Sequence, residues 1–350
     1  MQLQELLAEV IKQNASDLHI TVGKPPTIRV DDKLIPIANQ EVLTPETTEN
    51  LVLSLLTNEQ KEILMQDKEF DFSYAYNDQG RFRVNAYFQK SYLAASLRLI
   101  PAKVKTFEEL NLPEILKSFA SAQQGFFISC GPAGHGKTTT VAAMVDYINK
   151  QRSDHIITIE DPIEYTFIQD KCLIDQREVH LDTHSFPQAL KSCLRQDPDV
   201  IFVGEMRDLE TISTAATLAE TGHLVLSTLH TNNAADTIDR MVGVFPPHQQ
   251  EQIRFQLASS LLGMISQRLI PRIDKPGRIV VAEVLKINAA ARNLIREGKT
   301  YQLNNIILTS KQEGMISLDT SLAELVKSKI ISKENALAYA IDQKNLSMLL

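Results

Sequence analysis

Eight residues in the middle of the chain constrain its fold more than any other feature. Gly131-Pro132-Ala133-Gly134-His135-Gly136-Lys137-Thr138 fits the pattern G-x-x-x-x-G-K-T. The apolar run 126–130 before it predicts a buried strand, and residues 138–150 after it predict a helix. Strand, glycine-rich turn and helix in this order are the setting in which the pattern holds phosphate. The sequence therefore predicts a P-loop that follows a strand of a parallel sheet.

The residue types in this loop suit the binding of a nucleotide. Glycines allow backbone N–H groups to curl around phosphate oxygens, and the helix N-terminus adds a favourable partial charge. We expect Lys137 to reach the β- and γ-phosphates and the Thr138 hydroxyl to bind Mg²⁺. Thr139 should line the helix start, so residues 131–139 are assigned to the nucleotide. His135 occupies a variable slot, and we expect a solvated side chain there rather than a catalyst.

Two acidic turns follow apolar runs further along the chain. Glu205 comes just after residues 200–203, where a P-loop protein needs a carboxylate to hold the water shell of Mg²⁺. Ile159-Glu160-Asp161-Pro162-Ile163-Glu164 closes the run 156–159, and three carboxylates together are unfavourable without a nearby cation or basic group. We expect Glu164 to polarise the attacking water as general base, and Glu160 to orient water or metal from behind it. A surface glutamate and a capped turn are the alternatives.

Two histidines flank another apolar run, residues 224–229. His230 follows the run, where a sensor of the γ-phosphate would lie in a parallel sheet. His223 precedes it and could report across a subunit boundary. The alternative for both is a buried or capping histidine, and the two do not have the spacing of a metal-ligand pair.

The remaining segments predict two α/β regions joined by a linker at 101–105. Residues 1–100 predict a small α/β domain with helices at its start and over 45–66, and strands at 17–22, 27–30, 34–37, 70–76, 81–89 and 93–99. Residues 106–350 predict a largely parallel sheet with helices on both faces and a mainly helical tail from about 286, the strands lying at 125–130, 156–160, 200–203, 224–229 and 278–285.

Composition limits the class of protein. The 350 residues carry a net charge of −7, and no apolar stretch approaches the length of a membrane span. The amphipathic N-terminus lacks the cationic region of a signal peptide. Three separated cysteines provide neither a zinc nor a redox pair and suit reduced thiols. We expect a soluble, acidic, cytoplasmic protein without affinity for nucleic acid, although net charge alone leaves a local basic channel open.

The motifs together resemble the secretion ATPase superfamily, which includes type II secretion, type IV pilus and type IV secretion motors. The segments that carry this resemblance are IEDPIE at 159–164, QREV at 176–179, RQDPDVIFVGEMRD at 195–208 and TGHLVLSTLHTN at 221–232. SDLHI at 16–20 and AARNLIRE at 290–297 are similar to the start and the C-terminal retraction motif of the PilT-like pilus retraction ATPases. That motif usually has isoleucine where this chain has Ala291. Assembly and type II secretion ATPases carry an extra N-terminal region and commonly a four-cysteine metal module, and from 350 residues with three cysteines we expect neither here.

The resemblance covers nearly the whole chain and implies an architecture. It implies a PAS-like N-terminal domain, and a RecA-like P-loop ATPase domain with a helical tail. It implies a homohexamer that binds ATP and Mg²⁺ between subunits. Walker A, Asp box, Walker B and His box map onto 131–138, 160–164, 199–205 and 223–230. Arginines of the N-terminal domain approach the phosphates in such motors. Arg83 and Arg98 match best and Arg81 is a weaker candidate, with a surface ion pair as the alternative for each.

The resemblance also implies a function and partners. We expect an ATPase motor at the inner-membrane base of the pilus machine that drives pilus retraction and twitching motility. Its expected partners are an inner-membrane platform protein, which it would turn, and a paralogous retraction ATPase. Pilus assembly or type II secretion by the same chemistry, a RecA-like nucleic-acid translocase, and a non-catalytic nucleotide-binding regulator are the alternatives.

Overall fold

The computed structural model describes residues 2–30, 33–77, 80–100 and 104–350, and it divides into two compact units. The N-terminal unit holds the described residues as far as 100 together with 161–166. The C-terminal unit holds 104–160 and 167–350. Most of the expected linker, and the central residues of the turns expected at 31–33 and 77–80, lie outside the described residues.

The N-terminal unit is built on a six-stranded sheet in the order β3-β2-β1-β6-β5-β4, in which every pair is antiparallel. Helix α2 begins as expected, because the Thr44 hydroxyl accepts a hydrogen bond from the Thr47 N–H and Pro45 takes the first helical position. The elements of the N-terminal unit are α1 (Leu3–Lys12), β1 (Asp17–Ile20), β2 (Thr27–Val30), β3 (Lys33–Pro36), α2 (Pro45–Leu53), α3 (Asn58–Asp67), β4 (Glu69–Tyr76), β5 (Gly80–Gln89) and β6 (Tyr92–Ile100).

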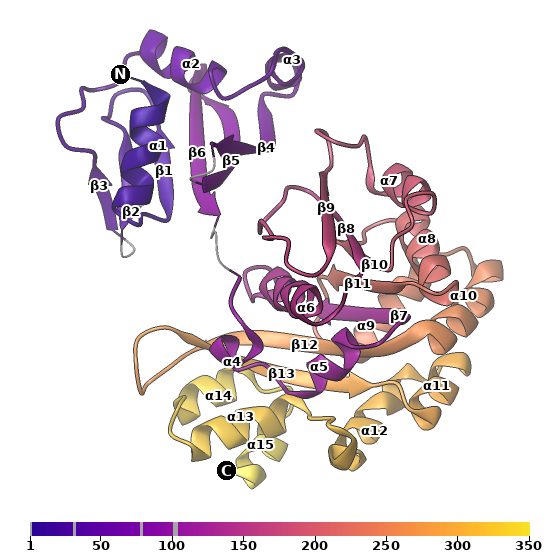
Figure 1. Ribbon diagram of the computed structural model, residues 1–350. Coiled ribbons are helices and arrows are strands. Elements are labelled where there is room, and N and C mark those ends of the chain that lie inside the picture. The colour runs from indigo at the N-terminus through magenta and orange to yellow at the C-terminus, as the bar shows by residue number, and fades with distance from the viewer. Residues whose placement is uncertain (1, 31–32, 78–79, 101–103) are drawn as a thin grey trace. The chain divides into compact units, whose positions relative to one another are not determined.

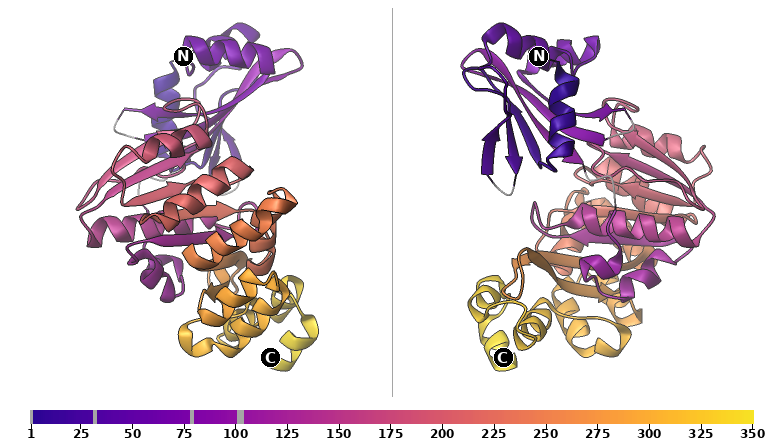
Figure 2. Two further views of the ribbon diagram at one scale, coloured as in Figure 1. Left: turned by 90° about the vertical axis from the view of Figure 1, so that its right-hand side faces the viewer. Right: turned by 60° about the vertical axis from the view of Figure 1, so that its left-hand side comes forward.

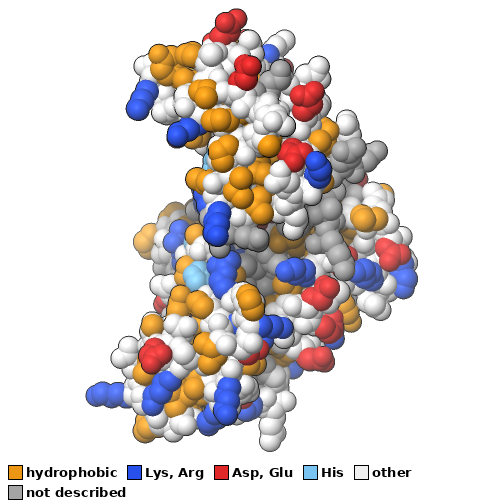
Figure 3. Space-filling view, turned by 90° about the vertical axis from the view of Figure 1, so that its left-hand side faces the viewer, with side chains coloured by type: hydrophobic (Ala, Val, Ile, Leu, Met, Phe, Trp, Pro, Cys, Tyr) orange, Lys and Arg blue, Asp and Glu red, His pale blue; other side chains and the backbone are white. Residues whose placement is uncertain are grey.

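One edge of this sheet is exposed. Strand β3 is open to solvent along its whole length. Hydrophobic side chains gather over the N-terminal unit on the face drawn in Figure 3, and the exposed ones of this unit include Leu34, Ile35 and Val42. The hydrophobic core of the unit forms where α1 and α2 bury their leucines against the inward-facing side chains of β1, β5 and β6.

The C-terminal unit is built on a seven-stranded sheet in the order β13-β12-β7-β11-β10-β8-β9 (Figure 1). Only the pair β12–β13 is antiparallel among the strands described. The elements that form and cover the sheet are α4 (Phe107–Leu110), α5 (Ile115–Ala120), β7 (Gly125–Cys130), α6 (Lys137–Gln151), β8 (His155–Glu160), β9 (Leu173–Glu178), α7 (Phe186–Cys193), β10 (Val200–Val203), α8 (Leu209–Glu220), β11 (Leu224–Leu229), α9 (Ala234–Gly243), α10 (Pro247–Ser260), β12 (Leu261–Pro271) and β13 (Arg278–Lys286).

A helical tail follows the sheet, as the sequence predicts. It consists of α11 (Ala289–Arg296), η1 (Thr300–Gln302), α12 (Leu303–Thr309), η2 (Lys311–Glu313), α13 (Leu318–Lys327), α14 (Lys333–Tyr339) and α15 (Gln343–Leu349). Helices α7 to α12 share one core with the strands, while α13 to α15 pack on Ile270, Ile279 and Val281 of the β12–β13 hairpin (Figure 2). In the part of the chain that is described, no helix is long and apolar enough to cross a membrane.

Two strands of this sheet are missing from the sequence prediction. Strand β9 is partly exposed and mostly polar, with the sequence Leu173-Ile174-Asp175-Gln176-Arg177-Glu178. Helix α10 ends at Ser260 and strand β12 begins at the next residue, Leu261. Neither residue is a glycine or a proline, so the sequence does not indicate that a helix ends there. The sheet is largely parallel as expected, but its antiparallel end depends on this unpredicted strand.

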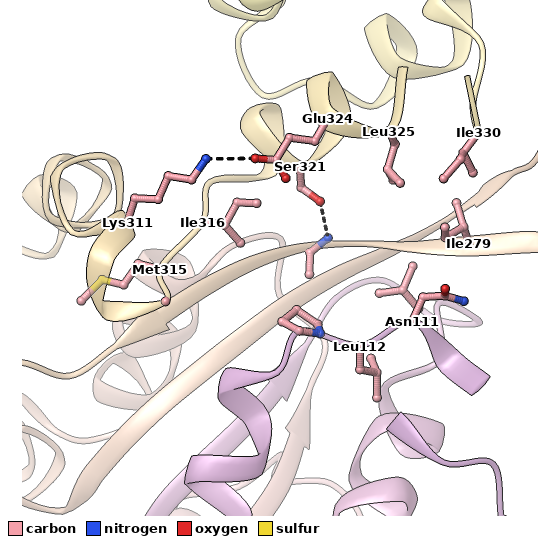
Figure 4. A pocket seen from close by; sticks show the side chains of 14 residues that line it. Asn111, Leu112, Ile279, Lys311, Met315, Ile316, Ser321, Glu324, Leu325 and Ile330 are labelled. Carbon is pink, nitrogen blue, oxygen red and sulfur yellow. Dashed lines mark hydrogen bonds and ion pairs between the residues drawn. The ribbon is translucent and has the colours of Figure 1, made fainter. Parts of the chain in front are cut away.

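A cavity of about 440 Å³ opens beside β13 in the C-terminal unit (Figure 4). The Ser321 hydroxyl faces the backbone N–H of Ala282 there, at 3.4 Å, and Lys311 pairs with Glu324 at 3.0 Å. None of the residues that line it belongs to the P-loop or to the acidic turns. The cavity is therefore separate from the expected chemistry.

Candidate active site

The carboxyl ends of four neighbouring parallel strands lie at one edge of the C-terminal sheet. The P-loop follows β7, Glu160 ends β8, Glu205 lies just after β10, and His230 follows β11. Ligands of open parallel sheets bind at this edge, because the loops that follow the strands meet there. The fold thus places four of the predicted motifs together within one unit.

The P-loop depends on glycine at defined positions. Gly131, Gly134 and Gly136 have backbone φ angles of 146°, 74° and 82°, which residues other than glycine rarely adopt. Helix α6 begins at Lys137, so its first backbone N–H groups point into the loop. The loop therefore has the shape and the helix N-terminus that a phosphate group requires.

A chain of polar contacts joins three of the predicted catalytic residues. Lys137 is buried, and its Nζ donates to the Pro132 carbonyl at 2.9 Å and lies 3.2 Å from His230 Nδ1. His230 Nε2 lies 3.8 Å from Glu205 Oε2. Burial and the Lys137 charge hold the pKa of His230 below its usual value, which favours the neutral imidazole that the lysine contact needs. Lys137 is thus held where an incoming phosphate could replace its contacts with Pro132 and His230.

Glu205 has a second partner, which the sequence reasoning did not single out. Arg207 Nη2 lies 2.8 Å from Glu205 Oε1, and the arginine side chain is otherwise exposed. The positive charge of Arg207 offsets the negative charge of the Glu205 carboxylate. Its signal was present in the sequence, since an arginine two residues after a carboxylate at a strand end can reach back to it.

Glu160 is buried at the end of β8. Its Oε1 accepts hydrogen bonds from Thr158 Oγ1 at 2.7 Å and from Gln176 Nε2 at 3.4 Å. A buried carboxylate with such partners has a fixed orientation. Its surroundings suit the orienting role expected for it better than direct attack on a substrate.

His135 differs from the expectation of a solvated side chain. Its Nδ1 accepts a hydrogen bond from the Leu269 N–H at 2.8 Å, and its carbonyl accepts one from Gln267 Nε2 at 2.7 Å. The imidazole is half-buried and turned toward β12. Local sequence could not show this, because β12 itself was not predicted.

The other predicted site residues lie elsewhere. His223 precedes β11, six strand residues and roughly 20 Å from His230, and its ring bonds to the Leu218 carbonyl at 2.9 Å. Glu164 belongs to the segment that groups with the N-terminal unit, where its Oε1 lies 3.4 Å from Arg83 Nη1. Arg98 pairs with Asp17 at 2.9 Å.

Arg81, the weaker candidate, also has a partner in its own unit, since its Nε donates to Ser73 Oγ at 3.1 Å. All three candidate arginines therefore hold side-chain contacts within the N-terminal unit. The ion-pair alternative describes Arg83 and Arg98 as they lie here, while their approach to phosphate stays a prediction.

The side chains expected to hold Mg²⁺ have suitable chemistry. Thr138 is the second residue of α6, and Glu205 follows β10 at the same edge of the sheet. Mg²⁺ is usually bound by one or two protein oxygens together with phosphate oxygens and water. A hydroxyl and a carboxylate at this edge fit that pattern.

The segment resembling a retraction motif is helix α11. Ala291 is fully buried in the main core of the unit, so the small side chain faces inward. Arg292 Nε donates to the Ala258 carbonyl at 2.7 Å, and the Arg296 guanidinium lies 5.8 Å from the Phe255 ring centre. Both arginines thus attach α11 to α10.

Fold and site together define a P-loop nucleotide hydrolase with a RecA-like sheet. The chain belongs to the family described as "Type II/IV secretion system protein", whose model matches residues 1–337. It is 47% identical to the type IV pilus retraction ATPase PilT of Pseudomonas aeruginosa, over 96% of this chain and 97% of the relative. It is 40% identical to the type IV pilus ATPase PilU of the same organism, over 100% and 91%.

A solved structure supports the same assignment. The crystal structure of the pilus retraction motor PilT with bound ADP superposes with a TM-score of 0.92 at 44% identity, covering 99% of both chains. The two-unit α/β fold and the PilT-like resemblance predicted from the sequence are confirmed. The chain is an ATP-hydrolysing enzyme of this family.

Proposed function

We propose that this chain is a homohexameric motor that powers type IV pilus retraction, and with it twitching motility, from the cytoplasmic face of the inner membrane. Relatives whose names describe pilus retraction match nearly the whole chain. The observation that carries the catalytic part is the contact of 3.2 Å between Lys137 and His230 at the carboxyl edge of the sheet. It joins the phosphate-binding lysine to the loop that would sense the γ-phosphate.

The residues divide the work of hydrolysis in this proposal. Residues 131–139 bind ATP, and Glu164 orients and deprotonates the attacking water. Thr138 binds Mg²⁺ directly and Glu205 does so through water, and the ion would neutralise charge that develops on the phosphates. His230 senses the γ-phosphate and Glu160 holds the water network. His223 reports across the subunit boundary of the ring.

Coupling to movement requires contacts that differ between ATP and ADP. In the proposal, Arg83 and Arg98 supply them from the N-terminal domain of the same or a neighbouring subunit. Arg83 would then exchange its contact with Glu164 for the γ-phosphate. Sequential closure around the ring would rotate the inner-membrane platform protein and draw pilin out of the filament base.

Turnover by the purified chain tests the enzymatic half. Lys137→Ala should reduce phosphate release at least a hundredfold, because the lysine charge on the β- and γ-phosphates is lost. Lys150→Ala is the matched control, since Lys150 lies on the same helix and pairs with Asp146, four residues earlier on it. Phosphate release from Lys137→Ala near the wild-type rate would overturn the assigned role.

Deletion of the gene in its host tests the biological half. Abundant surface pili with lost motility are the expected result, because extension would continue without retraction. Bare cells would instead indicate a pilus assembly motor. Normal retraction until a second retraction ATPase is also deleted would indicate an accessory paralogue, which is relevant because the chain also aligns with PilU over its full length.

A further inference from the structure

Strand β12 continues past the end of its neighbour β7. The two strands pair from Leu261 opposite Phe126 to Ser266 opposite Cys130, and there β7 ends while β12 runs on to Pro271. The P-loop begins at the next residue, Gly131. The edge of β12 that faces β7 therefore goes on to face the P-loop.

Two groups on this part of β12, beyond the end of β7, bind one residue of the loop. The Leu269 N–H donates to His135 Nδ1 at 2.8 Å, and Gln267 Nε2 donates to the His135 carbonyl at 2.7 Å. The loop is thus attached to the strand through both the side chain and the backbone of His135.

The Gln267 side chain binds the loop's two flanks as well. It is fully buried, and its Oε1 accepts from Ser129 Oγ at 3.2 Å and from Thr140 Oγ1 at 2.9 Å. Ser129 lies at the end of β7 and Thr140 in the first turn of α6. One carboxamide therefore connects the strand before the loop, the loop itself and the helix after it.

The loop glycines show how closely β12 approaches. A Cβ on Gly131 would lie 2.6 Å from the Gln267 carbonyl oxygen, and one on Gly136 would lie 3.2 Å from Gln267 Nε2. A polar residue buried only to complete the core would not need this close packing on both ends of the phosphate loop.

We propose that Gln267 and His135 are positioning residues for ATP, which hold the P-loop backbone against β12 in the shape that receives phosphate. Fixing the loop before nucleotide binds reduces the ordering cost of binding. The proposal rests on ATP hydrolysis by this chain and is independent of its role in pilus retraction.

The protonation of His135 agrees with this arrangement. To accept from Leu269, Nδ1 must carry no proton. Burial, followed by the charges of Arg268, Arg278 and Lys137, lowers the pKa of His135, so the neutral form prevails at neutral pH.

A pair of substitutions at His135 tests the proposal in the purified full chain. His135→Leu removes the acceptor and leaves the Leu269 N–H unsatisfied, so the Kd for ADP and the KM for ATP should rise about tenfold. His135→Asn places an oxygen where Nδ1 was, so both constants should return to within about threefold of wild type. His248→Leu, at an exposed histidine on α10, is the matched control.

Gln267→Met supplies an independent test, because methionine has nearly the same volume and makes none of the three hydrogen bonds. The Kd for ADP should rise at least tenfold while the folded fraction binds with full stoichiometry. The proposal fails if His135→Leu and His135→Asn have equal ADP affinities. It also fails if His135→Leu or Gln267→Met lowers only the melting temperature and leaves the Kd for ADP and the KM for ATP unchanged.

Discussion

Replacing Gly131 with alanine tests how far the shape of the P-loop depends on β12. Gly131 has φ 146°, and an added Cβ would lie 2.6 Å from the backbone oxygen of Gln267. Nothing flexible can move aside there, because the contacted atom belongs to the strand. Gly134, three residues on, has φ 74° and no atom within 4 Å of an added Cβ. The two glycines therefore form a matched pair in one loop.

The expected magnitudes follow from these geometries. An alanine at Gly131 incurs a backbone strain of roughly 1–3 kcal/mol, and displacement of the β12 backbone adds about 1–3 kcal/mol. The free energy of unfolding should therefore fall by about 2–6 kcal/mol. At Gly134 only the left-handed backbone is penalised, by about 1–2 kcal/mol. Against a typical total of about 5–15 kcal/mol, the first loss is severe and the second is tolerable.

Urea unfolding followed by circular dichroism, without nucleotide, measures both losses. Because the chain has two units, the relevant transition is the one that saturating ADP moves to higher urea in the wild type. Gly131→Ala should lower its midpoint clearly more than Gly134→Ala, with little change in slope. Equal losses, or a larger loss at Gly134, would refute the claim that β12 forms a rigid wall for the loop.

Two further predictions concern buried titratable groups. Burial raises the pKa of Glu283, so the unfolded chain ionises first as pH rises above about 4.5 and the folded state loses stability. Glu283→Gln keeps an acceptor for the Ala234 N–H and should melt higher than wild type at pH 8, with little difference near pH 4.5; a pH-independent difference would contradict this. All three thiols are buried, with raised pKa values and that of Cys193 near 12, so a disulfide reagent should label none of Cys130, Cys172 and Cys193 until urea is added.

Runs of apolar residues and helix-capping residues in the sequence predicted the strands and helices whose signals lie within a few consecutive positions. Residues 125–130, 200–203 and 224–229 are mostly apolar, and they form strands that are buried along their whole length. Thr44 and Pro45 start α2 as capping rules require. The same rules failed at β12, where a helix passes into a strand without a turn residue, and the two signals could not be separated.

That one missed strand accounts for most of what was missed at the site. His135 and Gln267 lie 132 positions apart, so no local pattern relates them. Once β12 is placed beside β7, the buried Gln267 must find partners, because an unsatisfied buried amide is costly. The partners within reach are those of the P-loop, and the role of His135 follows from the same register.

The β12–β13 hairpin also connects the nucleotide site to the C-terminal tail. Ser266 Oγ and Arg268 Nη2 both donate to the Asn232 carbonyl, at 2.9 Å each, in the loop that follows His230. Farther along the same strand, Ile270 packs against helices α13 to α15. One strand therefore contacts the P-loop, the loop after His230 and the tail. Because packed interiors transmit displacement rather than absorb it, a shift of β12 cannot be confined to one of the three.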